Sequence, residues 1–177
     1  MLRASRAFTL IELLTVIAVL AILAGLIIGA GRRASETGKI ARTQAELAAL
    51  GAALEGYKRQ YGDYPRTADA AQLLQALVGK LDPLMRDLHP DGRVQLDVAL
   101  FTYDPPADPE KNANVRLVDP WGQPYVYIYK QQMSPWGRPD YVLASAGPDG
   151  RIDTTLLAGA RLNPDAADNL DNIHAPN

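Results

Sequence analysis

The chain has 177 residues, of which 47% are hydrophobic and 21% are charged, and its formal net charge is −2. This length fits one domain of ordinary size with an appendage, and the charge balance excludes a strongly basic nucleic-acid binder and a polyacidic disordered chain. Cysteine is absent and His89 and His174 are the only histidines. Disulfides and thiol catalysis are therefore excluded, and histidine-rich metal catalysis is disfavoured.

The hydrophobic residues are concentrated near the N-terminus. Nineteen of the 24 residues at 7–30 are hydrophobic, and the 19 residues at 13–31 carry no charge. A membrane-spanning helix needs about 17–25 such residues. A secretory signal has only about 7–15 of them before its cleavage site, and a buried core helix carries a polar stripe. The segment therefore predicts a membrane anchor, but paired arginines on both sides leave its orientation open.

One carboxylate, Glu12, lies at the start of this apolar segment. A charged side chain costs about 2.5–3.5 kcal/mol at the centre of a bilayer and less near its edge. Two interpretations follow: Glu12 sits at the headgroup boundary, or it is paired with a cation when the segment is buried.

The residues around Glu12 carry a resemblance to a known family. Arg6-Ala7-Phe8-Thr9-Leu10-Ile11-Glu12, followed by the apolar run, resembles the class III signal of type IV pilins and pseudopilins. The resemblance implies that an inner-membrane prepilin peptidase cuts between Ala7 and Phe8, and that the new terminal amine of Phe8 is methylated. It also implies that Glu12 neutralises the terminal amine of a neighbouring subunit during filament assembly. The family usually has Gly where this chain has Ala7.

The helical pattern continues beyond the apolar segment. Hydrophobic residues recur at steps of three, four and seven, which is typical of an amphipathic helix: Ile40, Leu47, Leu50, Leu54, Tyr57 and Tyr61. With no proline before Pro65, the pattern predicts a single helix from about Phe8 to Tyr61. Glu55 and Arg59 are spaced for an ion pair on its outer face. Gly62 and Pro65 end the helix.

A short helix is expected next, with Thr67 as its N-cap and Leu73, Leu74, Leu77 and Val78 as its apolar face. Strand-like segments follow at 94–103, 125–129 and 141–145, with a proline-rich loop at 104–114. Two of these regions resemble the major pseudopilin of type II secretion: residues 64–78 and the sequence D-P-W-G-Q-P-Y-V-Y at 119–127. In that family the second region is a turn that leads into an antiparallel strand.

The C-terminal part is rich in aspartate, with six aspartates and no glutamate at 140–177. Calcium prefers carboxylate and carbonyl oxygens on flexible loops. Residues 141–150 resemble the segment that opens the calcium loop of the major pseudopilin. The resemblance implies that Asp149, the Ala146 carbonyl and Asp171 are ligands.

The family's short spacer is expanded here by residues 152–169, so Asp153 and Asp168 are alternative calcium ligands. A solvated acidic tail, with a plain turn at Asp149, is the alternative interpretation of the whole segment.

Together these features predict an α+β, pilin-like fold, in which a long N-terminal helix packs on a small antiparallel sheet and a C-terminal loop. Residues 1–7 would be a cytoplasmic leader, 8–31 the transmembrane and filament-core half of the helix, and 32–177 a periplasmic domain. By resemblance the chain is a noncatalytic subunit of the type II secretion pseudopilus in the inner membrane. Its partners would be further copies, other pseudopilins, the prepilin peptidase and the inner-membrane assembly platform; its cofactor would be structural calcium.

Two alternatives stay open. One is a pilin or minor pilin of a surface type IV pilus, because the leader motif is shared by all pilin-like proteins. The other is a membrane-anchored periplasmic enzyme, although no Ser/His/Asp or metal-histidine pattern supports it.

Overall fold

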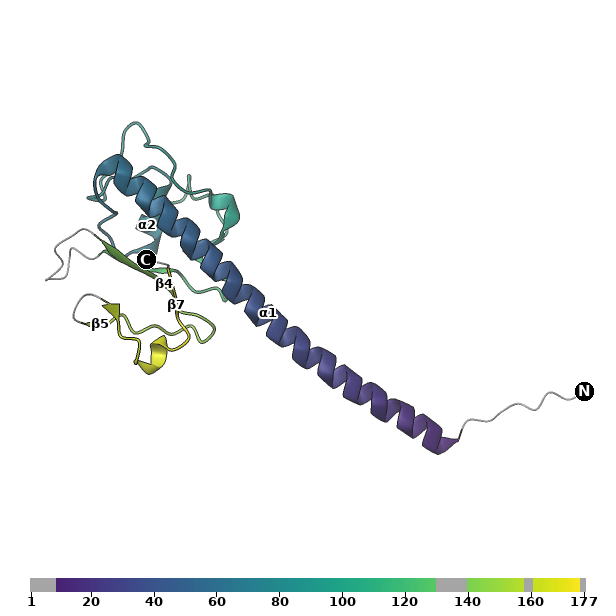
Figure 1. Ribbon diagram of the computed structural model, residues 1–177. Helices are drawn as coiled ribbons and strands as arrows, with labels where there is room; N and C mark the ends of the chain where they lie inside the picture. The colour runs from purple at the N-terminus through teal and green to yellow at the C-terminus, as the bar shows by residue number, and fades with distance from the viewer. Residues whose placement is uncertain (1–8, 130–139, 158–160, 176–177) are drawn as a thin grey trace, which may run out of the picture. The chain divides into compact units, whose positions relative to one another are not determined.

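Helix α1 spans Leu10–Tyr61 and ends at the predicted residue. Gly62 terminates it: its φ of 81° is a conformation that glycine adopts readily, and its amide bonds to the Lys58 carbonyl at 2.7 Å. The computed structural model (Figure 1) describes residues 9–129, 140–157 and 161–175. The residues group into two units, Met1–Gly38 and Lys39–Asn177.

The first unit contains the N-terminal turns of α1, which begin at a capped end. The Thr9 hydroxyl and carbonyl both accept from the Glu12 amide, at 3.3 and 3.1 Å, so Thr9 satisfies a donor that has no partner within the helix. Within the described residues, no helix has an apolar stretch of the length that crossing a membrane requires.

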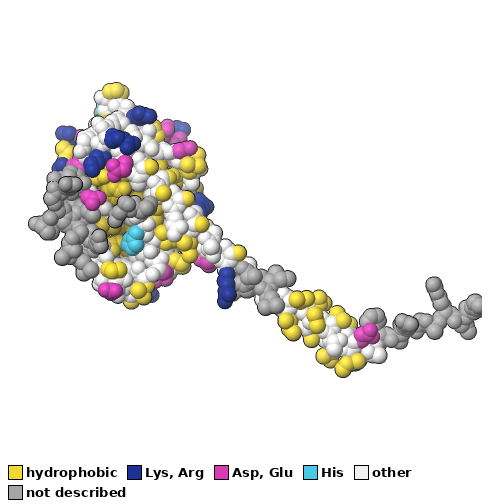
Figure 2. Space-filling model, in the orientation of Figure 1, with side chains coloured by type: hydrophobic (Ala, Val, Ile, Leu, Met, Phe, Trp, Pro, Cys, Tyr) yellow, Lys and Arg dark blue, Asp and Glu magenta, His cyan; other side chains and the backbone are white. Residues whose placement is uncertain are grey.

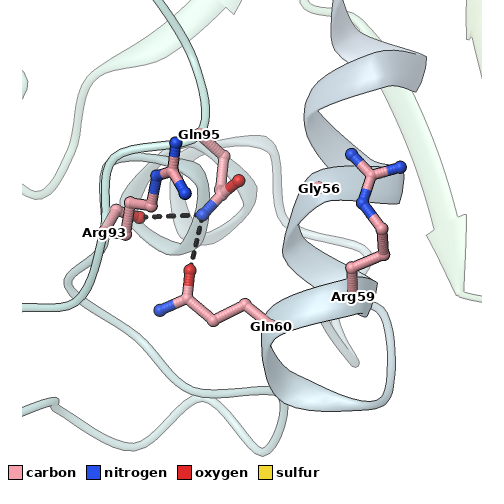
Figure 3. A pocket seen from close by; sticks show the side chains of 5 residues that line it. All are labelled: Gly56, Arg59, Gln60, Arg93 and Gln95. Carbon is pink, nitrogen blue, oxygen red and sulfur yellow. Dashed lines mark hydrogen bonds between the residues drawn. The ribbon is translucent and has the colours of Figure 1, made fainter.

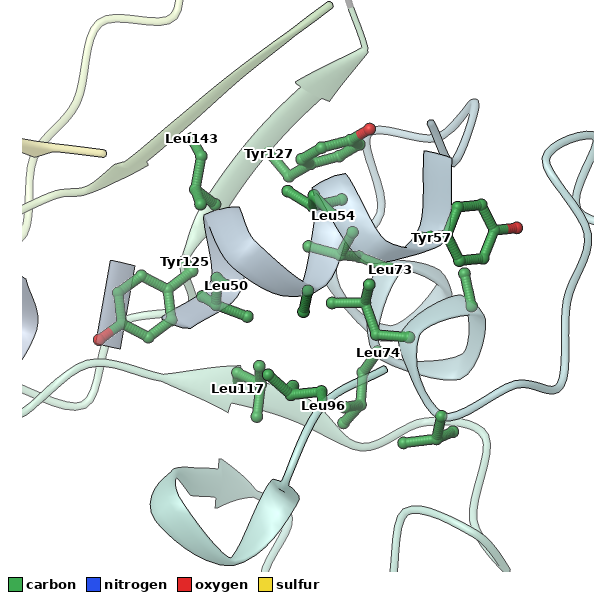
Figure 4. Close-up of a cluster of buried hydrophobic side chains, with 14 of the residues drawn as sticks. Leu50, Leu54, Tyr57, Leu73, Leu74, Leu96, Leu117, Tyr125, Tyr127 and Leu143 are labelled. Carbon is green, nitrogen blue, oxygen red and sulfur yellow. The ribbon is translucent and has the colours of Figure 1, made fainter. Parts of the chain in front are cut away.

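The second unit is built on the C-terminal half of α1, as Figure 4 shows. Leu47, Leu50, Leu54 and Tyr57 are fully buried, so most of the predicted apolar face is confirmed. Ile40 is an exception, with 36% of its surface exposed, because the buried face begins one helical turn later, at Thr43. The predicted Glu55–Arg59 pair is also wrong for the described residues, since the Glu55 carboxylate accepts from the Tyr64 hydroxyl instead.

Helix α2 (Ala70–Leu77) packs across this face, and the sequence assigned it the wrong N-cap. The Asp69 carboxylate accepts from the amides of Ala71 and Gln72, at 2.8 and 2.9 Å. The Thr67 hydroxyl accepts from the Asp69 amide instead, at 3.0 Å. Thr67 therefore holds the capping residue Asp69 in place and does not itself cap α2.

The described strands form three small antiparallel sheets, so the α+β prediction is confirmed. Strand β1 (Thr102–Asp104) pairs with β2 (Arg116–Val118), and β5 (Leu156–Leu157) pairs with β6 (Arg161–Leu162). The third sheet has the order β3–β4–β7, from Val126–Tyr129, Tyr141–Ser145 and Ile173–His174. Two short 3-10 helices complete the described elements: η1 (Val98–Leu100) and η3 (Ala167–Asn169).

The expected strand at 94–103 is wrong over most of its length. Asp97 caps η1 by accepting from the Ala99 amide at 3.1 Å, and strand pairing begins only at Thr102. The strand at 125–129 is confirmed, because Tyr127 and Tyr129 alternate with less buried residues as a half-buried strand requires. The Tyr127 hydroxyl donates to the Pro65 carbonyl at 2.8 Å, which ties β3 to the chain between the two α-helices.

Candidate functional site

The first candidate site is the start of α1. Ala7 and Phe8 lie outside the described residues, but Glu12 lies in the first turn of the helix and is exposed. Among the described residues no cation or donor contacts its carboxylate; the Glu12 amide and carbonyl bond to Thr9 and Thr15. Thr9 and Glu12 have the spacing of a capping box, which the sequence already contained.

The turns that follow Glu12 expose an unusual amount of apolar surface, visible in Figure 2. Ten large hydrophobic side chains are each 48–80% exposed: Leu10, Ile11, Leu13, Leu14, Val16, Ile17, Val19, Leu20, Ile22 and Leu23. They lie on every side of the helix, so no single face is left polar. An apolar surface of this extent indicates a region that other molecules cover.

The second candidate site is the loop at the end of β4, which the turn before β3 holds in place. Asp119 is 2% exposed, and its carboxylate accepts from the amides of Trp121 and Gln123 and from the Ser145 hydroxyl, at 3.0, 2.9 and 2.6 Å. Ser145 Oγ in turn accepts from the Gly147 amide at 3.1 Å. The motif at 119–127 and the segment at 141–150, which are separate in the sequence, are therefore joined by hydrogen bonds in the structure.

The loop Gly147–Gly150 is a tight turn that needs both glycines. Each has a φ of 69°, and the Gly150 amide bonds to the Gly147 carbonyl at 3.3 Å. A Cβ on Gly147 would lie 2.5 Å from the Asp171 carbonyl oxygen, so only glycine permits this close approach. The turn thereby brings residues 147–149 against Asp171.

Three of the predicted calcium ligands converge at this turn. Asp171 Oδ2 accepts from the Asp149 amide at 3.2 Å. Strands β4 and β7 pair Ala144 with His174 and Ser145 with Ile173. Continuing this register places Ala146 opposite Asn172. Ala146, Asp149 and Asp171 are therefore neighbours.

Asn172 adds an oxygen that the sequence reasoning missed. Its Nδ2 donates to the Asp168 carbonyl and to Asn169 Oδ1, at 3.2 and 2.7 Å. Its Oδ1 is buried and has no hydrogen-bond partner among the described residues. A buried oxygen without a donor is costly unless a water or a cation satisfies it. Asn172 directly follows the predicted ligand Asp171 in the D-N-I motif, and this position in the sequence could have identified Asn172 as a further ligand.

The alternative ligands Asp153 and Asp168 belong to a neighbouring part of the same loop. The Asp153 amide donates to Asn169 Oδ1 at 2.8 Å, and the Asp153 carboxylate accepts from the Thr155 amide at 2.8 Å. Asp168 lies 3.9 Å from Arg151. Across the described residues, no group of three or more acidic or histidine side chains is arranged to hold a metal. A cation at Asp149 and Asp171 would thus depend on neutral oxygens, such as those of Ala146 and Asn172, for its other ligands.

A capped, apolar N-terminal helix that continues into a small antiparallel α+β unit defines a pilin-like protein. Residues 2–28 match the family described as "Prokaryotic N-terminal methylation motif". The chain belongs to the family of type II secretion system core protein G, the major pseudopilins.

Relatives in three bacteria carry that name. The protein of Pseudomonas aeruginosa is 31% identical over 151 residues, which cover 84% of this chain and 87% of the relative. The protein of Escherichia coli K12 is 30% identical over 84% of this chain and 86% of the relative. That of Klebsiella pneumoniae is 30% identical over 94% of this chain and 93% of the relative. No solved structure matches the chain significantly.

Proposed function

We propose that this chain is the structural subunit of a type II secretion pseudopilus, which assembles into a helical filament and drives protein export through the outer membrane. The exposed apolar surface at Leu10–Leu23, which lies within the matched methylation motif, carries this proposal. Keeping a large apolar side chain out of water is worth about 1.5–3 kcal/mol, so a subunit that leaves the membrane would have to cover these ten side chains by packing against other helices. The role needs no catalytic group, and the chain would act without one.

The same helix would hold the subunit before assembly. Residues 8–31 would form a single-pass anchor in the inner membrane, with the leader at 1–7 in the cytoplasm and residues 32–177 in the periplasm. The 19 uncharged residues at 13–31 support this placement, because a span needs about 17–25. The prepilin peptidase, the other pseudopilins and the inner-membrane assembly platform are the expected partners.

Glu12 would direct assembly by pairing with a terminal amine. Cleavage after Ala7 makes Phe8 the first mature residue, whose methylated amine is a cation. The Glu12 carboxylate has no partner within the described residues, so it is available to the amine of a neighbouring subunit. Pairing would offset the cost of burying each charge among apolar helices. A subunit out of register would leave both charges buried and unpaired.

Calcium would close the C-terminal loop. Asp149, Asp171, the Ala146 carbonyl and Asn172 Oδ1 would hold it, since calcium takes six to eight oxygen ligands of these kinds. The buried, unsatisfied Asn172 oxygen favours this set of ligands over Asp153 and Asp168. Calcium would supply the crosslink that a chain without cysteine cannot form as a disulfide.

A deletion strain complemented with variants tests the function. The wild-type chain should restore secretion, and mass spectrometry should find a methylated Phe8 at the mature N-terminus. Glu12→Gln should be processed and membrane-bound but form no filaments, whereas the exposed control Glu110→Gln should behave as wild type. Normal secretion in the deletion strain, or cleavage near Gly31, would contradict the proposal. Loss of twitching with intact secretion would indicate a surface pilus instead.

A further inference from the structure

The C-terminal turns of α1 and the loop that follows α2 form an open pocket of about 360 Å³ (Figure 3). Gly56, Arg59 and Gln60 contribute from the helix, and Arg93 and Gln95 from the loop. Gln95 Nε2 donates to Gln60 Oε1 at 2.6 Å and to the Arg93 carbonyl at 3.2 Å, which fixes the loop against the helix. All five residues belong to the second unit.

Both guanidinium groups in this pocket lack an acidic partner among the described residues. Glu55, one turn before Arg59, is occupied by the Tyr64 hydroxyl. The nearest acid before Arg93 in the sequence, Asp91, pairs with Lys80. Arg93 lines the pocket from the loop and Arg59 from the helix (Figure 3), so the pocket favours an anion.

Gly56 lines the pocket and leaves room for the Gln95 side chain. A Cβ at this position would lie 2.6 Å from Gln95 Oε1 and 3.8 Å from Arg59 Nη2. The absence of a side chain therefore allows the Gln95 amide to lie close to the helix, near Arg59. Guanidinium groups bind carboxylates through paired hydrogen bonds, and the amides of Gln60 and Gln95 can orient such a ligand. The chemistry fits an acidic peptide segment.

This chain carries such a segment around η3. Asp165 is exposed, and its carboxylate accepts no hydrogen bond from any described residue. Asp168 lies three residues later, and its exposed carboxylate makes one long ion pair, with 3.9 Å between Asp168 Oδ1 and Arg151 Nη1. Leu170 beside them is 74% exposed, and Val94 beside Arg93 is 52% exposed. The acidic segment thus presents two carboxylates and the apolar Leu170. The pocket presents two guanidinium groups and the apolar Val94, so the two surfaces are complementary.

The acidic segment and the pocket cannot meet within one chain as it is folded. In Figure 1 the segment of η3, drawn in yellow, lies across the β3–β4–β7 sheet from the C-terminal turns of α1. A contact between two different surfaces of identical subunits is heterologous, and its repetition generates an open helical assembly. We propose that Asp165 and Asp168 of one copy bind Arg59 and Arg93 of the next copy. This contact rests on the proposed function, because it would link subunits of the filament.

Site-directed crosslinking tests the contact without background, because the chain has no cysteine. Val94→Cys is placed in one tagged full-length chain and Ala166→Cys in a second, so that all four charged residues stay intact. Filaments assembled from both chains are treated with a short bismaleimide. We expect a crosslinked dimer that carries both tags. Arg59→Gln with Arg93→Gln should lower its yield about tenfold, since two exposed ion pairs are lost. The control Lys111→Gln removes one exposed charge elsewhere and should change nothing.

Charge reversal provides the second arm. Arg93→Glu should abolish the crosslink, and Asp165→Arg in the partner chain should restore it. Filaments that form normally without any crosslink would overturn the contact and leave the proposed function standing. A crosslink that persists unchanged in the double Arg→Gln variant would overturn the role of the arginines. Absence of filaments in the cysteine-bearing chains with otherwise wild-type sequence, together with intact secretion in the deletion strain, would overturn the proposed function itself.

Discussion

The Ser145 hydroxyl donates a hydrogen bond of 2.6 Å to the buried Asp119 carboxylate. This contact joins the turn before β3 to the end of β4, from which the Gly147–Gly150 loop departs. Gln123 extends the same connection, because its side chain lies 3.3 Å from the position that a Cβ on Gly150 would occupy. The tryptophan-containing turn therefore supports the aspartate loop.

Removing the Asp119 carboxylate should destabilise the second unit strongly. Asp119→Ala leaves the Trp121 and Gln123 amides and the Ser145 hydroxyl without their acceptor. We expect a loss of about 3 kcal/mol in the free energy of unfolding, measured by urea denaturation of the full chain in detergent. Ser145→Ala removes one donor and should cost less, about 1 kcal/mol. Equal effects of the two substitutions would show that Asp119 does not organise the turn.

Calcium should raise the melting temperature, and a chelator should lower it. A ligand present at about 100 times its Kd stabilises by about 2.7 kcal/mol, which corresponds to about 5–10 °C for a chain of this size. Asn172→Ala and Asp149→Ala should abolish this shift, whereas the surface control Asp108→Asn should retain it. The proposed site fails if millimolar calcium moves the melting temperature of neither the wild type nor the control.

Buried tyrosines should make the second unit sensitive to alkali. Burial, together with the hydrogen bond to Asp63, raises the pKa of Tyr129 from 10.0 to about 12, and burial also raises the pKa of Tyr141 to about 12. A raised pKa means that the unfolded chain loses these protons first. The stabilisation is therefore complete below pH 10 and is lost as the pH rises from about 10 to 12.

A pH series of thermal denaturation, followed by circular dichroism, measures this loss. The melting temperature of the wild type should fall steeply above pH 10. Tyr129→Phe should start lower, since Asp63 loses a donor, and should decline less steeply with pH. An equally steep decline in this variant would mean that Tyr129 does not contribute to the alkaline transition.

Shortening a side chain on the buried face of α1 should lower the stability of the second unit, because it leaves a cavity in the core. Leu50 is fully buried, and Leu50→Ala should cost about 2–5 kcal/mol in the free energy of unfolding. Leu100→Ala makes the same change at a side chain that is 64% exposed, and it should stay within about 0.5 kcal/mol of the wild type. Urea denaturation of both variants gives the comparison, and similar losses would contradict the assignment of the core.

Much of the helical structure was predictable because its signals are local. The spacing of Leu47, Leu50 and Leu54 marks one face of a helix, and Gly62 and Pro65 mark its end. Where two local signals competed, the sequence alone was insufficient. Thr67 and Asp69 are both good N-caps, and only the hydrogen bond from the Asp69 amide to Thr67 shows which one caps α2.

Polar pairing was the least predictable feature, because it depends on competition between distant residues. Glu55 and Arg59 have favourable spacing, yet the Tyr64 hydroxyl donates to the Glu55 carboxylate, and no acidic side chain among the described residues pairs with Arg59. The strand expected at 94–103 failed for a related reason: Asp97 caps a 3-10 turn and removes residues 98–100 from pairing.

The N-terminal motif, the two helices and the family resemblance were determined by the sequence alone, since each depends on residues close together in the chain. The uneven distribution of the 47% hydrophobic residues was likewise readable at once. Only the tertiary structure decided that Asp119 supports the loop of Asp149, that Asn172 Oδ1 has no hydrogen-bond partner among the described residues, and that Arg59 and Arg93 line one pocket. Those relationships arise when packing of α1 and the sheets brings together residues that lie 20 to 35 positions apart, and no local pattern encodes them.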